Sequence, residues 1–181
     1  MKKLVLIFVF AISTSLIFAQ GTNKDSSLTR KEKRKAEIEK QYQLTKDMLE
    51  NRNFVLESDS LENRYGNRFP VSPNINFVKV DPNGEAVIQI GSNWRVGPNG
   101  VGGVTAKGKI TRWDFTTNQK NKTFNVKMFV MTPIGMYDLN FSVMAGGQAT
   151  ARLTGNYSGH LTFDGDLVPT DQSAVYEGWS I

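Results

Sequence analysis

The chain has 181 residues, no cysteine, one histidine, and 22 Lys or Arg against 17 Asp or Glu. The absence of cysteine excludes disulfides, thiol catalysis and thiolate metal sites, and a single histidine cannot form a histidine pair for a metal. The positive charge is confined to one segment, because residues 20–53 hold nine Lys or Arg and six Asp or Glu, whereas residues 54–181 hold eleven of each. We expect no nucleic acid, metal or other cofactor to bind.

The N-terminal residues are typical of a secretory signal peptide. A basic start and a short apolar run over residues 4–12 lead to the small residue Ala19. The run is shorter than the ~20 apolar residues that a membrane-spanning helix needs. We therefore expect residues 1–19 to be removed and the mature protein to be periplasmic or secreted. It would consist of a linker and a basic amphipathic helix over residues 20–52, followed by an antiparallel β-domain over residues 53–181.

The predicted helix starts at Thr29, which forms a capping box with Glu32, and no proline or glycine interrupts it before about Asn51. An apolar stripe at helical spacing comprises Ile38, Tyr42, Thr45 and Leu49. Two interpretations of this helix are open. Its later turns pack on the β-domain while its charged first turns are solvated, or the basic turns contact an anionic surface such as lipid, glycan or a partner.

The first strands alternate with recognisable turns. One strand opens at Phe54, and residues 70–73 are extended but cannot form a central strand, because proline donates no amide hydrogen bond. Strands over residues 76–80 and 85–90 flank residues 81–84, Asp-Pro-Asn-Gly, which is a strong hairpin turn.

A long strand follows a glycine-rich segment. We expect it over residues 105–116, with Gly108 marking a bulge or bend. Trp113 and Phe115 share one face of this strand and could pair with Val126 and Phe124, respectively. We expect the chain to end with another strand, over residues 174–181.

Residues 123–144 predict a hairpin whose register separates core from solvent. If residues 123–131 and 136–144 fold about the turn at residues 132–135, Met131 meets Met136. Eight apolar or aromatic residues then share one face, which comprises Phe124, Val126, Met128, Val130, Tyr137, Leu139, Phe141 and Val143. A slip of one residue would bury Lys127, so the register is strongly specified.

The remaining pattern extends this hairpin into a meander. Ala149, Ala151 and Leu153 would face Val143, Phe141 and Leu139, and the next inward face comprises Leu161, Phe163, Gly165 and Leu167. The fold class is therefore all-β with one N-terminal helix, built as an antiparallel meander of about eight strands. A small, lipocalin-like barrel suits this strand number better than the alternative, a two-sheet sandwich.

Four stretches resemble a known family. They are residues 54–57 (FVLE), 71–78 (VSPNINFV), 97–104 (GPNGVGGV) and 169–175 (PTDQSAV). Together they are similar to the secreted domain-of-unknown-function family 4251 of Bacteroidota, from about residue 30 to the end. The resemblance implies a periplasmic or exported protein and carries no catalytic residue to this sequence.

The glycine-rich loop over residues 97–103 is the best candidate for a contact surface, although it is not a phosphate loop. A phosphate loop would open a helix, whereas residues 105–107 here open a strand. Aromatic and arginine side chains on loops are common binding anchors. The candidate ligand-binding residues are Trp94, Arg95, Asn99, Gly100 and Gly103.

No other constellation indicates catalysis. His160 is expected at a strand start, and Asp164 and Asp166 on the solvent face of a strand, although two carboxylates could bind calcium or share a proton. Met131 and Met136 should form an apolar patch, either covered by the helix or offered to a partner.

The sequence therefore favours a non-catalytic envelope protein that binds a small apolar ligand or a protein partner, with a ligand pocket near Gly165 and Ala149. Two alternatives are a carboxylate-based glycan hydrolase and a structural module tethered to the envelope by its basic helix. The oligomeric state is not predicted.

Overall fold

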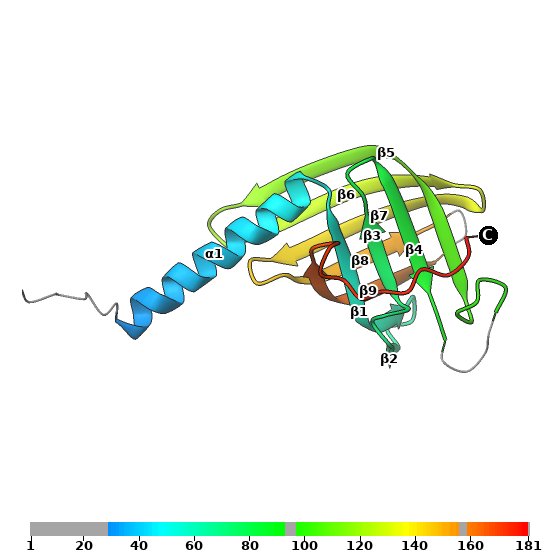
Figure 1. The fold of residues 1–181 in the computed structure, drawn as a ribbon, viewed down its shortest axis with the longest axis horizontal. Helices are drawn as coiled ribbons and strands as arrows, with labels where there is room; N and C mark the ends of the chain where they lie inside the picture. Colours follow the sequence, from blue (N-terminus) through cyan, green and yellow to red (C-terminus); the bar gives the residue numbers. More distant parts are fainter. Residues whose placement is uncertain (1–28, 93–96, 156–158, 181) are drawn as a thin grey trace, which may run out of the picture.

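The computed structural model describes residues 29–92, 97–155 and 159–180, so the predicted signal peptide and nearly all of the linker lie outside the described residues. One helix precedes a series of antiparallel strands (Figure 1). The elements are α1 (Arg30–Glu50), β1 (Phe54–Asn63), β2 (Arg68–Pro70), β3 (Phe77–Val80), β4 (Glu85–Ile90), β5 (Val104–Asn118), β6 (Thr123–Thr132), β7 (Gly135–Met144), β8 (Gln148–Thr154) and β9 (His160–Val168).

The strands form a closed barrel, as predicted, and not a sandwich. Strands β3 to β9 pair consecutively, and β1 joins β3 on one side and β9 on the other. The closing pair runs from Val55 opposite Val168 to Asn63 opposite Leu161. Eight strands therefore make up the barrel. The short strand β2 contains Pro70 and adds to the end of β1, in keeping with the expected edge position.

The predicted register of the central hairpin is confirmed. Met131 lies opposite Met136 and Val126 opposite Phe141, with all intervening pairs as expected. On the next strand Phe141 faces Ala151, also as expected. The Asp-Pro-Asn-Gly turn is formed too, because Gly84 takes a φ of 83° and its N–H donates to the carbonyl of Asp81.

The pairing of β5 with β6 differs from the prediction by two residues. Trp113 lies opposite Met128 and Phe115 opposite Val126, because β5 continues to Asn118 and leaves a shorter turn than expected. A shift of two preserves the inward face, so the core is unaffected. The bulge lies at Thr111 and not at Gly108. Gly108 instead allows close approach of β6, since a Cβ there would lie 2.1 Å from the carbonyl oxygen of Met131.

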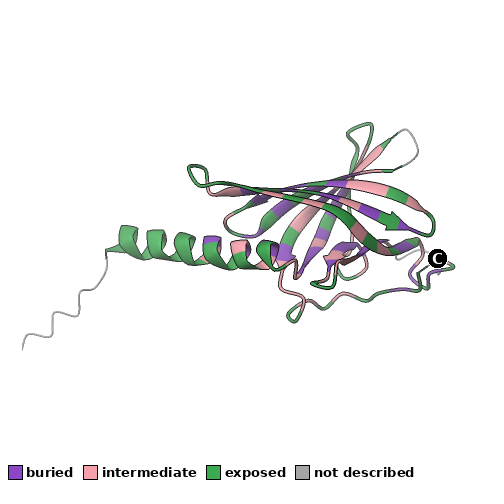
Figure 2. Ribbon diagram, turned by 90° about the horizontal axis from the view of Figure 1, so that it is seen from above, coloured by how far each residue is buried: buried purple, intermediate pink, exposed green. Residues whose placement is uncertain are grey.

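Helix α1 covers one end of the barrel with its last turns. The predicted capping box is present between Thr29 and Glu32. Residues 29–40 are all exposed, whereas Tyr42, Thr45 and Leu49 are buried (Figure 2). The hydroxyl of Thr45 donates to the carbonyl of Ala145, in the β7–β8 turn, at 3.0 Å. Within the described residues, no helix has both the length and the hydropathy needed to cross a membrane.

The chain end is not the strand that was predicted. After β9, residues 173–180 form an extended strap, which lies across the outer face of the barrel over β3 and β4 (Figure 1, red). Val175 packs there on an outer apolar cluster, formed by Val55, Phe77 and Val87. The reason is topological: β9 already pairs with β1, so neither closing strand has an edge left for a further strand.

The barrel interior is filled by side chains. Phe54 packs edge-on against Phe141, with ring centroids 5.8 Å apart, and Phe163 and Leu139 are fully buried beside them. The pocket expected beside Gly165 and Ala149 does not lie inside the barrel: both residues line a shallow depression on the outer surface, and a Cβ on Gly165 would lie 1.9 Å from the carbonyl oxygen of Glu57. The backbone of β1 therefore occupies the space that the missing side chain would leave.

Candidate functional site

The glycine-rich loop places three of the five predicted site residues in structural roles. Asn99 is buried, and its Oδ1 accepts hydrogen bonds from the N–H groups of Val101 and Gly103 at 3.2 and 3.0 Å. Gly100 occupies an exposed turn with a φ of 78°. Gly103 lets the loop pass β4, since a Cβ there would lie 2.0 Å from the carbonyl oxygen of Ile90. The other two predicted residues, Trp94 and Arg95, lie outside the described residues.

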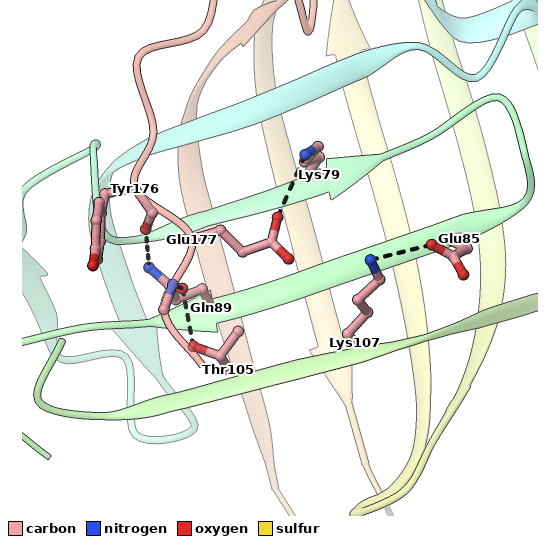
Figure 3. Close-up of polar contacts among 8 residues, drawn as sticks. Lys79, Glu85, Gln89, Thr105, Lys107, Tyr176 and Glu177 are labelled. Atoms are coloured by element: carbon pink, nitrogen blue, oxygen red, sulfur yellow. Dashed lines mark hydrogen bonds and ion pairs between the residues drawn. The ribbon is translucent and has the colours of Figure 1, made fainter. Parts of the chain in front are cut away.

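A buried glutamine ties this region of the barrel to the strap (Figure 3). The amide nitrogen of Gln89 donates to the carbonyls of Ile75 and Tyr176, at 3.1 and 2.8 Å. Its amide oxygen accepts from the hydroxyl of Thr105 and the N–H of Gly178, at 2.9 and 2.8 Å. The fully buried side chain of Gln89 therefore bonds the backbone of the strap at Tyr176 and Gly178, as a neighbouring strand would.

Two ion pairs lie on the same outer face. Glu177, on the strap, is 3.4 Å from Lys79, and Glu85 is 3.2 Å from Lys107 (Figure 3). The hydrogen bond with Glu85, reinforced by the charge of Glu177, raises the pKa of Lys107. All four groups are at least partly exposed, so each pair contributes little to stability. The Glu177–Lys79 pair joins the strap to β3 and the Glu85–Lys107 pair joins β4 to β5, and neither arrangement indicates a reaction.

The predicted carboxylate pair lies on an outer shelf of the barrel. Asp164 and Asp166 share the solvent face of β9 and line a shallow depression of about 290 Å³ with Arg68. Asp164 is held by the hydroxyl of Thr150 at 2.7 Å and by the guanidinium of Arg68 at 3.4 Å. Among the described residues, no three His, Asp or Glu side chains gather closely enough to hold a metal ion. Asp164 is therefore part of a surface polar network.

The methionine patch is not covered by the helix. Met131 and Met136 are 50% and 45% exposed at the β6–β7 turn, beside Ile134. The interpretation that α1 covers them is wrong, because α1 contacts the opposite end of β7, near Ala145. His160 begins β9, as expected, with its Nδ1 3.1 Å from the guanidinium of Arg152.

A second depression lies between α1 and the projecting end of β5. We call it the helix–strand groove, and its volume is about 600 Å³, within the range usual for ligand sites. One wall is a face of the helix and the other is the inner face of β5 with the β5–β6 turn. Its lining residues are Glu39, Tyr42, Gln43, Lys46, Glu50, Phe115, Thr117, Gln119 and Lys122.

Stacked aromatic rings form the apolar side of the groove. Tyr42 stacks on Phe124 at 4.7 Å, and Phe115 stacks on the same ring at 6.0 Å. These contacts fix the helix against the inner face of β5 and β6. The helix and strand walls of the groove are thus fixed by packed aromatic rings.

Lys122 latches the turn to the helix. It takes a φ of 52°, its ammonium lies over the Tyr42 ring at 4.9 Å, and it forms an ion pair with Glu39. The hydrogen bond that the Lys122 ammonium donates to the Glu39 carboxylate lowers the pKa of Glu39, and a hydrogen bond from the Gln43 side chain lowers it further. Lys46 pairs with Glu50 one turn further along at 3.4 Å. The charged groups that line the groove therefore neutralise one another.

The sequence does not reveal this groove. Tyr42 was expected to face the β-domain, but Gln43, Lys46 and Glu50 look like the solvated side of any surface helix. The available signal is their spacing, since residues 39, 43, 46 and 50 share one helix face. Nothing in the sequence places that face beside β5.

The family model of a domain of unknown function, DUF4251, matches residues 36–167. The chain belongs to the DUF4251 family. It is also similar to the crystal structure of a DUF4251 family protein from Bacteroides eggerthii, with 28% sequence identity and a TM-score of 0.62, over 74% of this chain and 90% of that chain. No curated protein matches the chain. The resemblance noted from the sequence motifs is thus confirmed.

The match assigns most of the molecule to the DUF4251 domain. Residues 36–167 include the helix wall of the groove and all of the barrel strands except Val168, the last residue of β9. The strap and the first turns of α1 lie outside the match.

Proposed function

We propose that this DUF4251 protein is an exported, non-catalytic binding protein of the cell envelope, which holds a protein partner in the helix–strand groove. The observation that carries the proposal is the groove itself: about 600 Å³, with an aromatic side and walls fixed by ring stacking. A binding site needs such a preformed concave surface with a few polar groups that orient its ligand.

The packed interior argues against the other ligand class, a small apolar molecule inside the barrel. An eight-stranded barrel either holds one small ligand or is filled by its own side chains. Here Phe54, Phe163 and Leu139 are fully buried in the interior, and the backbone of β1 fills the place beside Gly165. The groove is outside the barrel and is accessible to a macromolecule.

The charge pattern of the groove favours a protein over an anionic lipid surface. A lipid surface would be attracted by unpaired cations, but Lys122 pairs with Glu39 and Lys46 pairs with Glu50. The groove also contains the amides of Gln119 and of Gln43, whose nitrogen donates to Glu39 at 2.9 Å, and an amide has further donors and acceptors for a polypeptide.

Photocrosslinking in the native host tests this proposal. We would place benzoylphenylalanine at Gln43 or Thr117 in the groove, and at Lys127 on the exposed outer face of β6 as the matched control. The expected result is a discrete crosslinked protein from both groove positions and none from Lys127, lost again when Gln119→Trp fills the groove. Identical products from all three positions, or none, would refute the proposed site.

Export is tested separately. The proposal requires that residues 1–19 are absent from the mature protein. An intact mass measured on protein from the native host should begin at Gln20 or within a residue or two of it. A mass that retains Met1 to Ala19 would contradict export through this signal.

A further inference from the structure

We propose that the free edge of β5 binds an extended peptide segment of the partner by strand addition, with alternate peptide side chains entering the helix–strand groove. This inference rests on the proposed function and specifies the chemical class of its partner. It is argued from the pairing of β5, from the residues on its edge and from the neighbouring helix wall.

Strand β5 is much longer than its partner on one side. It pairs with β6 from Lys109 opposite Met131 to Asn118 opposite Thr123, but with β4 only from Val104 to Lys109, which lies opposite Glu85. The last backbone hydrogen bond on the β4 side runs from the N–H of Ile110 to the carbonyl of Gly84. Within the described part of the chain, residues 112–118 have no strand partner on this side.

The unpaired edge is accessible and regular. Of residues 112–118, only Trp113 and Phe115 are half-buried and the rest are exposed. Seven residues in strand conformation span about 23 Å. Every second residue of this segment directs its backbone N–H and C=O away from β6, and another polypeptide backbone is the chemistry that matches such a row.

The edge lacks the devices that usually block strand addition. Proteins protect edge strands with proline, with lysine, with inward-pointing charges or with bulges. Residues 112–118 contain neither proline nor lysine, and the bulge at Thr111 precedes them. The charged pair Arg112 and Asp114 lies on the outer face, where Arg112 is also 3.9 Å from Asp138. An open edge of this length would invite aggregation unless a partner occupies it.

The groove provides the side-chain contacts that strand addition alone cannot provide. Phe115 and Thr117 are two residues apart, so they line the groove from one face of β5. The opposite wall runs from Glu39 to Glu50 on α1, about 16 Å along the helix axis. A peptide on the β5 edge would therefore direct every second side chain toward this wall. Because the wall's charges are paired, we expect uncharged side chains at these positions.

A single peptide strand fits this edge better than a second copy of the chain. Helix α1 flanks the groove beside the projecting end of β5 (Figure 1), so a second barrel would have to avoid the helix in order to pair along the edge. An extended segment needs only the width of one strand. Self-association is therefore a competing outcome that the experiment must separate.

A phage-displayed library of random 12-residue peptides, selected on the purified mature chain, provides the probe. The strongest selected peptide is synthesised in three forms: unmodified, N-methylated at odd positions and N-methylated at even positions. N-methylation removes a backbone donor and leaves the side chain in place. Because only alternate N–H groups face β5, we expect one N-methylated form to bind roughly 10- to 100-fold more weakly and the other to bind nearly unchanged. Amide hydrogen exchange within residues 112–118 should slow when the unmodified peptide binds.

The remaining outcomes are distinguishable. Equal binding of all three forms, abolished by Gln119→Trp, would place the peptide in the groove without strand addition, which overturns this inference and leaves the proposed function intact. Failure to select any peptide would also overturn it. Concentration-dependent dimerisation that Thr116→Pro abolishes would assign the edge to a second copy of the chain and overturn the peptide assignment.

Discussion

Replacing Gln89 by methionine should release the strap while the barrel stays folded. Methionine fills a similar volume but provides none of the four hydrogen bonds that the Gln89 amide makes. Each such bond contributes about 0.5–1.5 kcal/mol, and a buried group left unpaired costs about 1–3 kcal/mol. If the strap stayed in place, the carbonyl of Tyr176 and the N–H of Gly178 would lose the hydrogen bonds that they make with Gln89. Detachment returns both groups to water and exposes the outer cluster around Val175.

The release of the strap sets the size of the loss in unfolding free energy. The global free energy of unfolding, measured by urea denaturation, should fall by about 2–4 kcal/mol, because detachment limits the loss to the contribution of the strap. Hydrogen exchange monitored by mass spectrometry should show the amides of Tyr176, Gly178 and Trp179 exchanging at the rate of an unstructured peptide. Glu177→Gln, which removes only a partly exposed ion pair, is the control and should cost at most about 1 kcal/mol. Unchanged protection of the strap in the Gln89→Met variant would refute the role assigned to this side chain.

Three further predictions concern the core, the glycine-rich loop and the latch. Phe141→Ala should destabilise the protein by about 3–5 kcal/mol in urea, whereas Lys127→Ala, on the exposed face, should change stability by less than about 0.5 kcal/mol; the opposite ranking would contradict the register. Gly103→Ala forces a Cβ onto the Ile90 carbonyl and should lower the unfolding free energy by about 1–3 kcal/mol, while Gly146→Ala, whose Cβ would meet nothing within 4 Å, should have little effect; equal melting temperatures would show that the loop moves freely. The pKa of Glu39 is lowered in the folded state, so the stabilisation from its contact with Lys122 is present above the usual carboxyl pKa and is lost as pH falls through the lowered value. An NMR titration of the carboxyl carbons should show Lys122→Met moving the Glu39 midpoint upward and leaving that of Glu32, which Thr29 holds low, in place.

The alternation of apolar and polar residues determines the register of most barrel strands, because one face of each strand is buried and the other faces solvent. The pairing of Val126 with Phe141, and of Phe141 with Ala151, follows from the positions of apolar residues alone. The exact end of β5 did not follow, because Thr116, Thr117 and Asn118 suit a turn as well as a strand. Their placement in the strand is decided by the pairing of Thr117 with Phe124.

The strap and the groove depend on contacts between residues distant in sequence. Val175, Glu177 and Trp179 alternate like a strand, but β1 and β9 pair with each other and have no edge left for it, and the side chain of Gln89 holds the strap instead. A glutamine in an apolar strand gives no indication of which distant backbone it will bind. Likewise, Gln43 and Thr117 become neighbours of one groove only when α1 packs against β5 and β6.

The closing pair of strands also determines the order in which the barrel can assemble. Every other neighbouring pair in the barrel is consecutive among its strands and can form as soon as both strands exist, whereas β1 must wait for β9, about a hundred residues later. Until then the apolar residues Val55, Leu56 and Leu61 have an unpaired edge. Such late, non-local pairing slows folding and leaves an aggregation-prone intermediate. A nascent chain that has not yet formed β9 would therefore expose the unpaired edge of β1 to aggregation.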